Sequence, residues 1–188
     1  MPPFAEPHVA ENRRSADSTM RVVRVAGIVL FALWVARYMW KPEPLLHGSL
    51  LIFHEAGHVL FIPFGEFMMV LGGSLFQLMV PAFFIAYFLR RQDAYAACFA
   101  GLYLAASLAG VAEYIADARA GELPLLGGER SNHDWTFLLI EMKLLNSDTA
   151  IGRFVDGIAA LVFLGSLAAG LRLAAPAPAL PVAAPETQ

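Results

Sequence analysis

Five long apolar segments alternate with short polar segments along the 188-residue chain. A helix needs about 20 apolar residues to cross the hydrocarbon core of a bilayer, and each of the five segments is close to that length. The segments comprise residues 22–40, 45–64, 67–89, 94–116 and 154–171. Because the first four are joined by only a few residues each, there is no room between them for a soluble domain. The pattern therefore predicts an all-α integral membrane protein, a compact bundle of about five transmembrane helices.

The two ends of the chain and one loop are the parts without this apolar pattern. Residues 1–20 are polar and lack the apolar stretch of a signal peptide, so we expect a disordered cytoplasmic arm. Residues 174–188 are rich in Ala and Pro, which predicts a disordered tail. The polytopic membrane domain is then 21–173, and its one sizeable connection is a cytoplasmic loop at about 118–152 with a short amphipathic stretch at 135–145.

Composition and charge agree with a membrane protein and exclude several other classes. Hydrophobic residues make up 58% of the chain and charged residues only 15%, against about 25% in soluble domains. A net charge of −3 offers no basic surface for nucleic acid, and a single cysteine, Cys98, excludes an intrachain disulfide. A cytoplasmic N terminus places eight of the 13 Lys and Arg residues on the cytoplasmic side. We therefore expect a bacterial inner-membrane protein with its N terminus in the cytoplasm.

The second apolar segment contains an HExxH motif, His54-Glu55-Ala56-Gly57-His58. Histidines four residues apart project from one face of a helix, as two ligands of a tetrahedral Zn²⁺ must, and Glu55 can act as general base on a metal-bound water. An ionisable residue at the middle of a bilayer costs about 2.5–3.5 kcal/mol, which a bound metal would offset. The motif predicts Zn²⁺ as cofactor. The alternative is a histidine pair satisfied by helix–helix hydrogen bonds beside a protonated Glu55.

Catalytic zinc needs a third protein ligand, for which the sequence offers several carboxylates and one imidazole. We favour Asp117, because a carboxylate near the end of the fourth segment can reach the metal without a long loop folding inward. Glu113, one helical turn earlier, is then a hydrogen-bonding partner of the site. His133 and Asp134 are the next candidates, since their loop could fold back beneath the bundle. Asp156, at the start of the last segment, ranks third.

An HExxH motif on a membrane helix, followed by a helix that bears glycines and an amide, resembles the site-2 class of intramembrane zinc metalloproteases. The resemblance covers roughly residues 45–84, and the segment that corresponds to the family's Gly-Pro…Asn sequence is Gly72-Gly73-Ser74-Leu75-Phe76-Gln77. The family's last zinc ligand is an aspartate in a Leu-Asp-Gly motif, and the nearest match here is Val155-Asp156-Gly157.

The resemblance implies zinc binding by His54 and His58 and general-base work by Glu55. It also implies a role for Gln77 in holding the backbone of a substrate; a buried amide could do this, or could serve ordinary helix packing. We therefore expect a zinc metallopeptidase that hydrolyses membrane or membrane-associated polypeptides. The alternative is a non-enzymatic zinc-binding membrane protein that acts as a partner or regulatory subunit, and unaltered function of Glu55→Gln would favour it.

Overall fold

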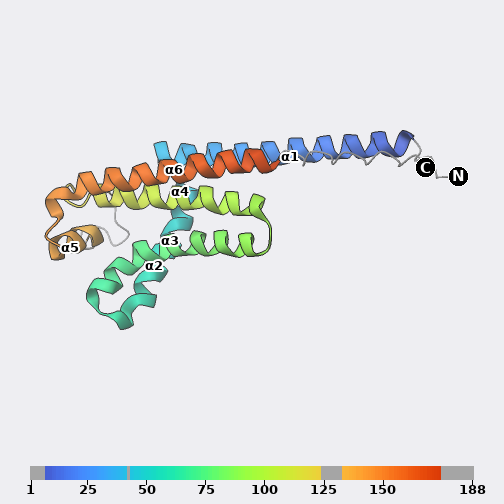
Figure 1. Cartoon of the computed structure of the whole chain (residues 1–188). Coiled ribbons are helices and arrows are strands. Elements are labelled where there is room, and N and C mark those ends of the chain that lie inside the picture. The colour runs from blue at the N-terminus through green and yellow to red at the C-terminus, as the bar shows by residue number, and fades with distance from the viewer. Residues whose placement is uncertain (1–6, 42, 124–132, 175–188) are drawn as a thin grey trace, which may run out of the picture.

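The computed structural model describes residues 7–41, 43–123 and 133–174, with side chains described from residue 17 onward. These residues form helices and connecting turns only (Figure 1). The elements in chain order are α1 (Pro7–Trp40), α2 (Pro44–Phe61), the 3₁₀ turn η1 (Ile62–Phe64), α3 (Glu66–Arg90), α4 (Ala94–Ala116), α5 (Asp134–Glu141), the 3₁₀ turn η3 (Leu145–Ser147) and α6 (Asp148–Ala174). The predicted all-α bundle is confirmed.

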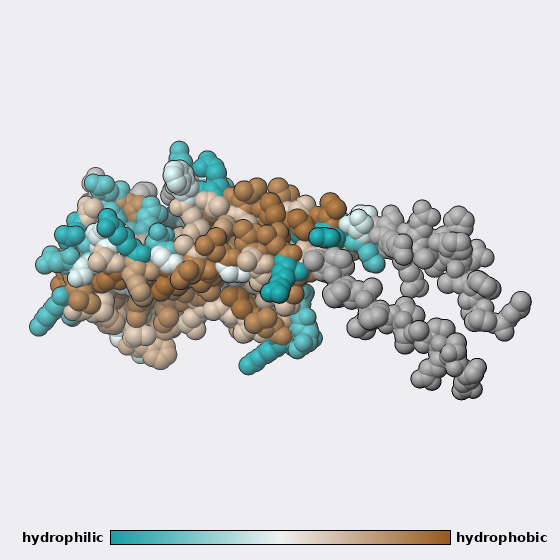
Figure 2. Space-filling model, turned by 45° about the horizontal axis from the view of Figure 1, so that its top comes forward, coloured by the Kyte–Doolittle hydropathy of each residue, from teal (hydrophilic) through white to brown (hydrophobic). Residues whose placement is uncertain are grey.

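Five of the helices are long and apolar enough to cross a membrane. These spans are Asp17–Trp40, Pro44–Phe64, Glu66–Arg90, Ala94–Ala116 and Leu145–Ala174. Figure 2 shows apolar side chains over the middle of the molecule and hydrophilic side chains gathered toward its ends. Because so much large apolar surface faces outward, the five helices indicate an integral membrane protein. On which side of the membrane the N terminus lies stays a prediction.

Local chemistry explains where the membrane helices begin and end. The carboxylate of Glu43 caps α2 by accepting hydrogen bonds from the backbone N–H groups of Leu45 and Leu46, and Asp93 caps α4 in the same way through Ala96. Gly65 has a φ of +90°, which separates η1 from α3. These caps and the glycine therefore turn the chain sharply between successive apolar helices.

Helix α4 is the centre of the bundle. It lies along α6 and α3 and also contacts α1 (Figure 1), and its span is the most buried of the five. Small residues allow this close approach: a Cβ on Gly101 would lie 2.2 Å from the Ser166 hydroxyl, and one on Gly152 would lie 2.8 Å from the Ala112 carbonyl oxygen. The small-residue face of α4 therefore fixes where α6 packs.

Helix α2 runs obliquely to α4 and α6 and packs against α3 (Figure 1). The two helices meet at glycines: a Cβ on Gly57 would come within 2.1 Å of the Gly72 carbonyl oxygen. No residue other than glycine fits at this crossing without separating the helices. The crossing brings the HExxH motif of α2 directly against α3.

The predicted arm, loop and tail are described in part. Of the predicted arm, the structure describes the residues from Pro7 onward, and these form the beginning of α1. Residues 1–6 of the arm and residues 175–188 of the predicted tail lie outside the described residues. Within the predicted loop at 118–152, α5 forms near the predicted amphipathic stretch, and it buries Leu138 and Leu139 completely.

Candidate metal centre

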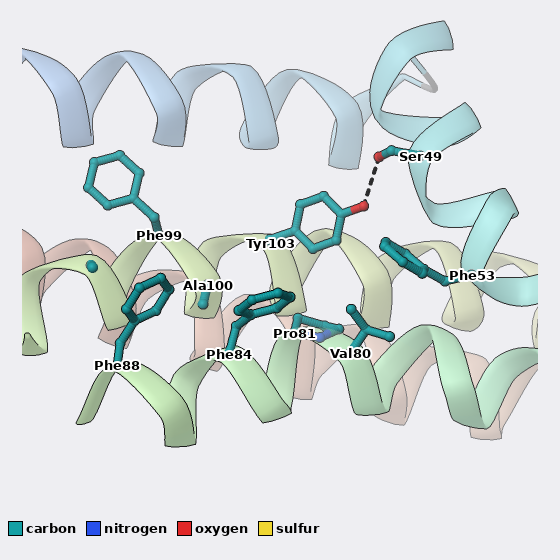
Figure 3. Close-up of a pocket in the computed structure, with 10 residues that line it drawn as sticks. Ser49, Phe53, Val80, Pro81, Phe84, Phe88, Phe99, Ala100 and Tyr103 are labelled. Atoms are coloured by element: carbon teal, nitrogen blue, oxygen red, sulfur yellow. Dashed lines mark hydrogen bonds between the residues drawn. The ribbon is translucent and has the colours of Figure 1, made fainter. Parts of the chain in front are cut away.

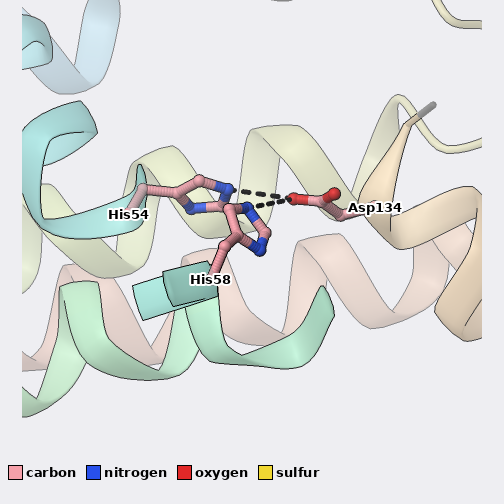
Figure 4. Close-up of side chains that lie close together, drawn as sticks. All are labelled: His54, His58 and Asp134. Carbon is pink, nitrogen blue, oxygen red and sulfur yellow. Dashed lines mark hydrogen bonds and ion pairs between the residues drawn. The ribbon is translucent and has the colours of Figure 1, made fainter. Parts of the chain in front are cut away.

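Three side chains from two helices meet at one point: His54 and His58 of α2 and Asp134 of α5 (Figure 4). One carboxylate oxygen, Oδ2 of Asp134, lies 3.0 Å from Nε2 of His54 and 3.2 Å from Nε2 of His58. One potential ligand atom from each residue lies within 4.8 Å of the other two. Two imidazoles and a carboxylate are a donor set that zinc and other transition metals bind. The group could therefore hold a metal ion.

The far side of each imidazole is held by a carbonyl oxygen. His54 Nδ1 lies 3.2 Å from Oε1 of Gln77, and His58 Nδ1 lies 2.9 Å from the backbone oxygen of Met69. The amide of Gln77 is oriented by its nitrogen, which donates to the Ser107 carbonyl oxygen at 3.3 Å. Because carbonyl oxygens only accept hydrogen bonds, both rings carry a proton on Nδ1. In the neutral rings, both Nε2 atoms are then free to act as ligands.

The space between these atoms suits a cation. Two neutral Nε2 lone pairs and a carboxylate oxygen facing one another repel, so protons or a metal ion must separate them. Helix α3 leaves room on its side of the group, because a Cβ on Gly73 would lie only 2.7 Å from Nε2 of both His54 and His58. Donor chemistry and available space therefore both fit a bound metal at His54, His58 and Asp134.

Asp134 is the first residue of α5, and several contacts hold it at the site. Its backbone N–H donates to the Tyr114 hydroxyl at 3.1 Å, and the next residue, Trp135, donates from Nε1 to the Ser74 hydroxyl at 3.0 Å. Burial raises the pKa of the Asp134 carboxyl, but without a metal, His54 and His58 donate hydrogen bonds to it when they are protonated on Nε2, and these outweigh burial and lower that pKa to about 2. Asp134 is therefore a carboxylate at neutral pH.

Glu55, the predicted general base, lies outside the group of three. Its side chain is exposed and forms no hydrogen bond or ion pair within the described part of the chain. It follows His54 directly on α2 and lies three residues before His58, at a spacing that makes side chains neighbours on a helix. The Glu55 carboxylate is therefore near the group and free to bind water or substrate.

Asp117, the third ligand favoured by sequence, does not belong to the group formed by His54, His58 and Asp134. Its two carboxylate oxygens accept hydrogen bonds from the backbone N–H groups of Glu122 and Leu123 at 3.0 and 3.1 Å, because the chain folds back over the end of α4. Oδ2 also lies 3.3 Å from Nε2 of His133. Asp117 and His133 thus form a second pair, separate from the group that could hold a metal.

The other candidates from the sequence lie elsewhere. Glu113 is exposed on α4 and Asp156 is exposed on α6, and neither belongs to the group. Gln77 is buried, and its amide contacts His54 through Oε1 and Ser107 through Nε2.

Pro81 explains why the Gln77 backbone is also engaged. Proline lacks the N–H that would bond the carbonyl oxygen four residues earlier in the helix, and the Ser107 hydroxyl donates to that oxygen of Gln77 instead, at 2.9 Å. Ser107 therefore satisfies both the side chain and the backbone of Gln77. Ser107 and Tyr114 have no recognisable signal in the sequence, because a lone hydroxyl in an apolar segment matches no motif.

An apolar groove lies between α2, α3 and α4 (Figure 3). Its cavity has a volume of about 530 Å³, and Phe53, the residue before His54, is part of its wall. Aromatic rings such as Phe84 line half of it. In its wall, the hydroxyls of Ser49 and Tyr103 form a hydrogen bond of 2.7 Å.

No known protein family, curated protein or solved structure matches the chain. What is established is a bundle with five long apolar helices and a group of two histidines and one aspartate that could bind a metal ion.

Proposed function

We propose that the chain is a membrane-embedded zinc metallopeptidase in which His54, His58 and Asp134 bind Zn²⁺. The observation that carries the proposal is the meeting of the HExxH histidines with a carboxylate from a separate helix. Three protein ligands that leave a fourth position open are typical of catalytic zinc sites, whereas structural sites have four. When bound, zinc lowers the pKa of a water toward about 7 and polarises a substrate carbonyl.

The residues of the chain then have separate tasks. Gln77 and the Met69 carbonyl fix the imidazoles of His54 and His58 through Nδ1. Glu55 has no partner among the described residues, so its carboxylate oxygens accept the proton of the attacking water and later donate it to the nitrogen of the leaving amine. One C–O bond forms and the C–N bond of the peptide breaks, so no oxidant or further cofactor is needed.

The position of the site indicates the class of substrate. His54 and His58 lie in a helix that could cross the membrane, and the apolar groove is lined by aromatic and aliphatic side chains. A membrane or membrane-associated polypeptide fits these surroundings better than a soluble, charged one does. Because helical carbonyls are already hydrogen-bonded, the substrate must unwind locally before cleavage.

Metal analysis of the protein purified in detergent tests the zinc site. We expect one equivalent of zinc, lost in His54→Ala, His58→Ala and Asp134→Ala, and retained in Asp156→Ala, whose carboxylate is exposed on α6. Unchanged zinc content in the first three variants would exclude a zinc enzyme at this site.

Glu55→Gln separates an enzyme from a non-enzymatic zinc-binding protein. We expect this variant to keep its zinc and to cleave a labelled apolar peptide in vesicles at least about 100-fold more slowly, because a general base contributes about 10² to 10⁴ to the rate. The same cleavage rate in Glu55→Gln would favour the partner or regulatory role. Loss of zinc from Glu55→Gln would instead make Glu55 a ligand.

A further inference from the structure

The third potential ligand of the metal group comes from a helix that is too short to be stable by itself. Helix α5 has eight residues, and isolated helices shorter than about 12 residues are marginal in water. Asp134 is its first residue, so the place of the carboxylate depends on how the start of α5 docks on the rest of the protein. The docking contacts therefore determine whether the carboxylate of Asp134 lies beside the two imidazoles.

The start of α5 contacts the end of α4 and the residues after it, and Trp135 also joins it to Ser74 of α3. The Tyr114 hydroxyl accepts the backbone N–H of Asp134 at 3.1 Å, and the Ala118 carbonyl oxygen accepts the hydroxyl of Thr136. The Tyr114 ring is near two histidines: its centroid lies 5.8 Å from that of His54 and 4.2 Å from that of His133. The end of α4 thus touches both α5 and the first zinc-binding histidine.

Asp117 and His133 form a polar pair within this contact, which also includes the buried Leu139 and Ala118. The side chains of Asp117 and His133 are 9% and 8% exposed, and Asp117 Oδ2 lies 3.3 Å from His133 Nε2. His133 Nδ1 accepts the N–H of Thr136 at 3.3 Å and so caps α5, which leaves the ring proton on Nε2. Among the described side chains, Nε2 of His133 is the buried nitrogen without a hydrogen bond, and the acceptor atom that faces it is Oδ2 of Asp117.

We propose that Asp117 and His133 are positioning residues for the metal site: their pairing docks the start of α5 on α4 and thereby holds Asp134 against His54 and His58. The inference rests on the proposed zinc site and assigns Asp117 a role through Asp134, not a direct bond to the metal. Asp117 suits this role because its oxygens also accept the N–H groups of Glu122 and Leu123, which fixes the carboxylate.

Two variants remove the pairing and keep most of the volume. Asp117→Asn replaces the carboxylate by an amide. His133→Asn keeps a good helix cap but lacks Nε2. Partners that orient metal ligands are typically worth 10- to 100-fold in metal affinity, so we expect each variant to weaken zinc binding by about that factor in chelator competition. In the double variant we expect a loss smaller than the sum of the two single losses, because both variants remove the pairing that Asp117 and His133 share.

Two further measurements distinguish positioning from direct ligation and from general instability. With saturating Co²⁺ in place of zinc, the visible spectrum of Asp117→Asn matches that of the unaltered protein, whereas Asp134→Asn changes it. The emission of Trp135, read in a Trp34→Phe/Trp40→Phe background, reports the docking of α5, since Trp135 donates to Ser74. We expect this emission to shift to the red in both metal-free variants and to recover with excess zinc.

Several results would overturn the inference. An altered Co²⁺ spectrum in Asp117→Asn would make Asp117 a ligand, and zinc affinity unchanged in both variants would show that α5 docks without the pair. In either case, loss of zinc in His54→Ala and Asp134→Ala leaves the proposed function intact. If zinc binding survives in those two as well, both proposals fail.

Discussion

Gly73→Ala adds one methyl group beside the candidate metal ligands. The new Cβ would lie 2.7 Å from Nε2 of His54 and 2.7 Å from Nε2 of His58, about 0.7 Å closer than the 3.4 Å at which ordinary contact begins. The three atoms nearest to this Cβ all belong to imidazoles, which can swing aside without moving the backbone. We therefore expect Gly73→Ala to leave the fold intact and to displace the metal.

The size of the effect follows from the cost of overpacking. Extra methyl groups in a packed site cost about 1–3 kcal/mol, which corresponds to about 5- to 150-fold in a binding constant. Alanine is a better helix former than glycine by nearly 1 kcal/mol, so the melting temperature without metal is unchanged or higher. The zinc dissociation constant, measured by chelator competition, should therefore rise about 5- to 150-fold without loss of stability.

Gly157→Ala is the matched control, because a Cβ there meets no atom within 4 Å. This variant should bind zinc as the unaltered protein does. Equal zinc affinity in Gly73→Ala and Gly157→Ala would show that the ion does not bind between these imidazoles.

Three further changes test the surroundings of the site. Gly57→Ala drives a Cβ to 2.1 Å from a carbonyl oxygen on α3, so a thermal scan should show a clear loss of stability, in contrast to Gly73→Ala. Gln77→Leu leaves His54 Nδ1 without its acceptor and should weaken zinc binding about 10- to 100-fold in the chelator assay; Asn at position 77 is too short to restore it. Ser107→Ala strands the carbonyl oxygen that Pro81 leaves unpaired, which should lower the unfolding free energy by about 1–3 kcal/mol; an unchanged denaturant midpoint would contradict this account.

Much of the fold and half of the candidate site are visible in the sequence, because both depend on local spacing. Segment length and apolar content predict the five helices, and a separation of four residues places His54 and His58 on one face wherever the helix packs. The role of Gln77 is different: sequence indicates a buried amide, but only the packing of α3 on α2 and α4 shows that its partners are His54 and Ser107.

The position of the aspartate in the group depends on tertiary structure. Asp117 and Asp134 both lie near the expected end of the bundle, and spacing along the chain does not separate them. Their tertiary contacts distinguish them. The oxygens of Asp117 accept hydrogen bonds from the backbone N–H groups of Glu122 and Leu123, whereas the carboxylate of Asp134, the first residue of α5, contacts His54. The sequence allows a loop that folds back beneath the bundle, but no local pattern favours His133 or Asp134 over Asp117 as the third ligand.

The separation of the three side chains along the chain has a consequence for biosynthesis. Asp134 follows His54 by 80 residues. At about 5–20 residues per second, the ribosome delivers the carboxylate roughly 4–16 s after the first histidine. During that interval only the two imidazoles of the group have been synthesised. A metal site of this composition can therefore be completed only after α4 and the start of α5 have also been synthesised, so the set of ligands is incomplete while the first helices are made.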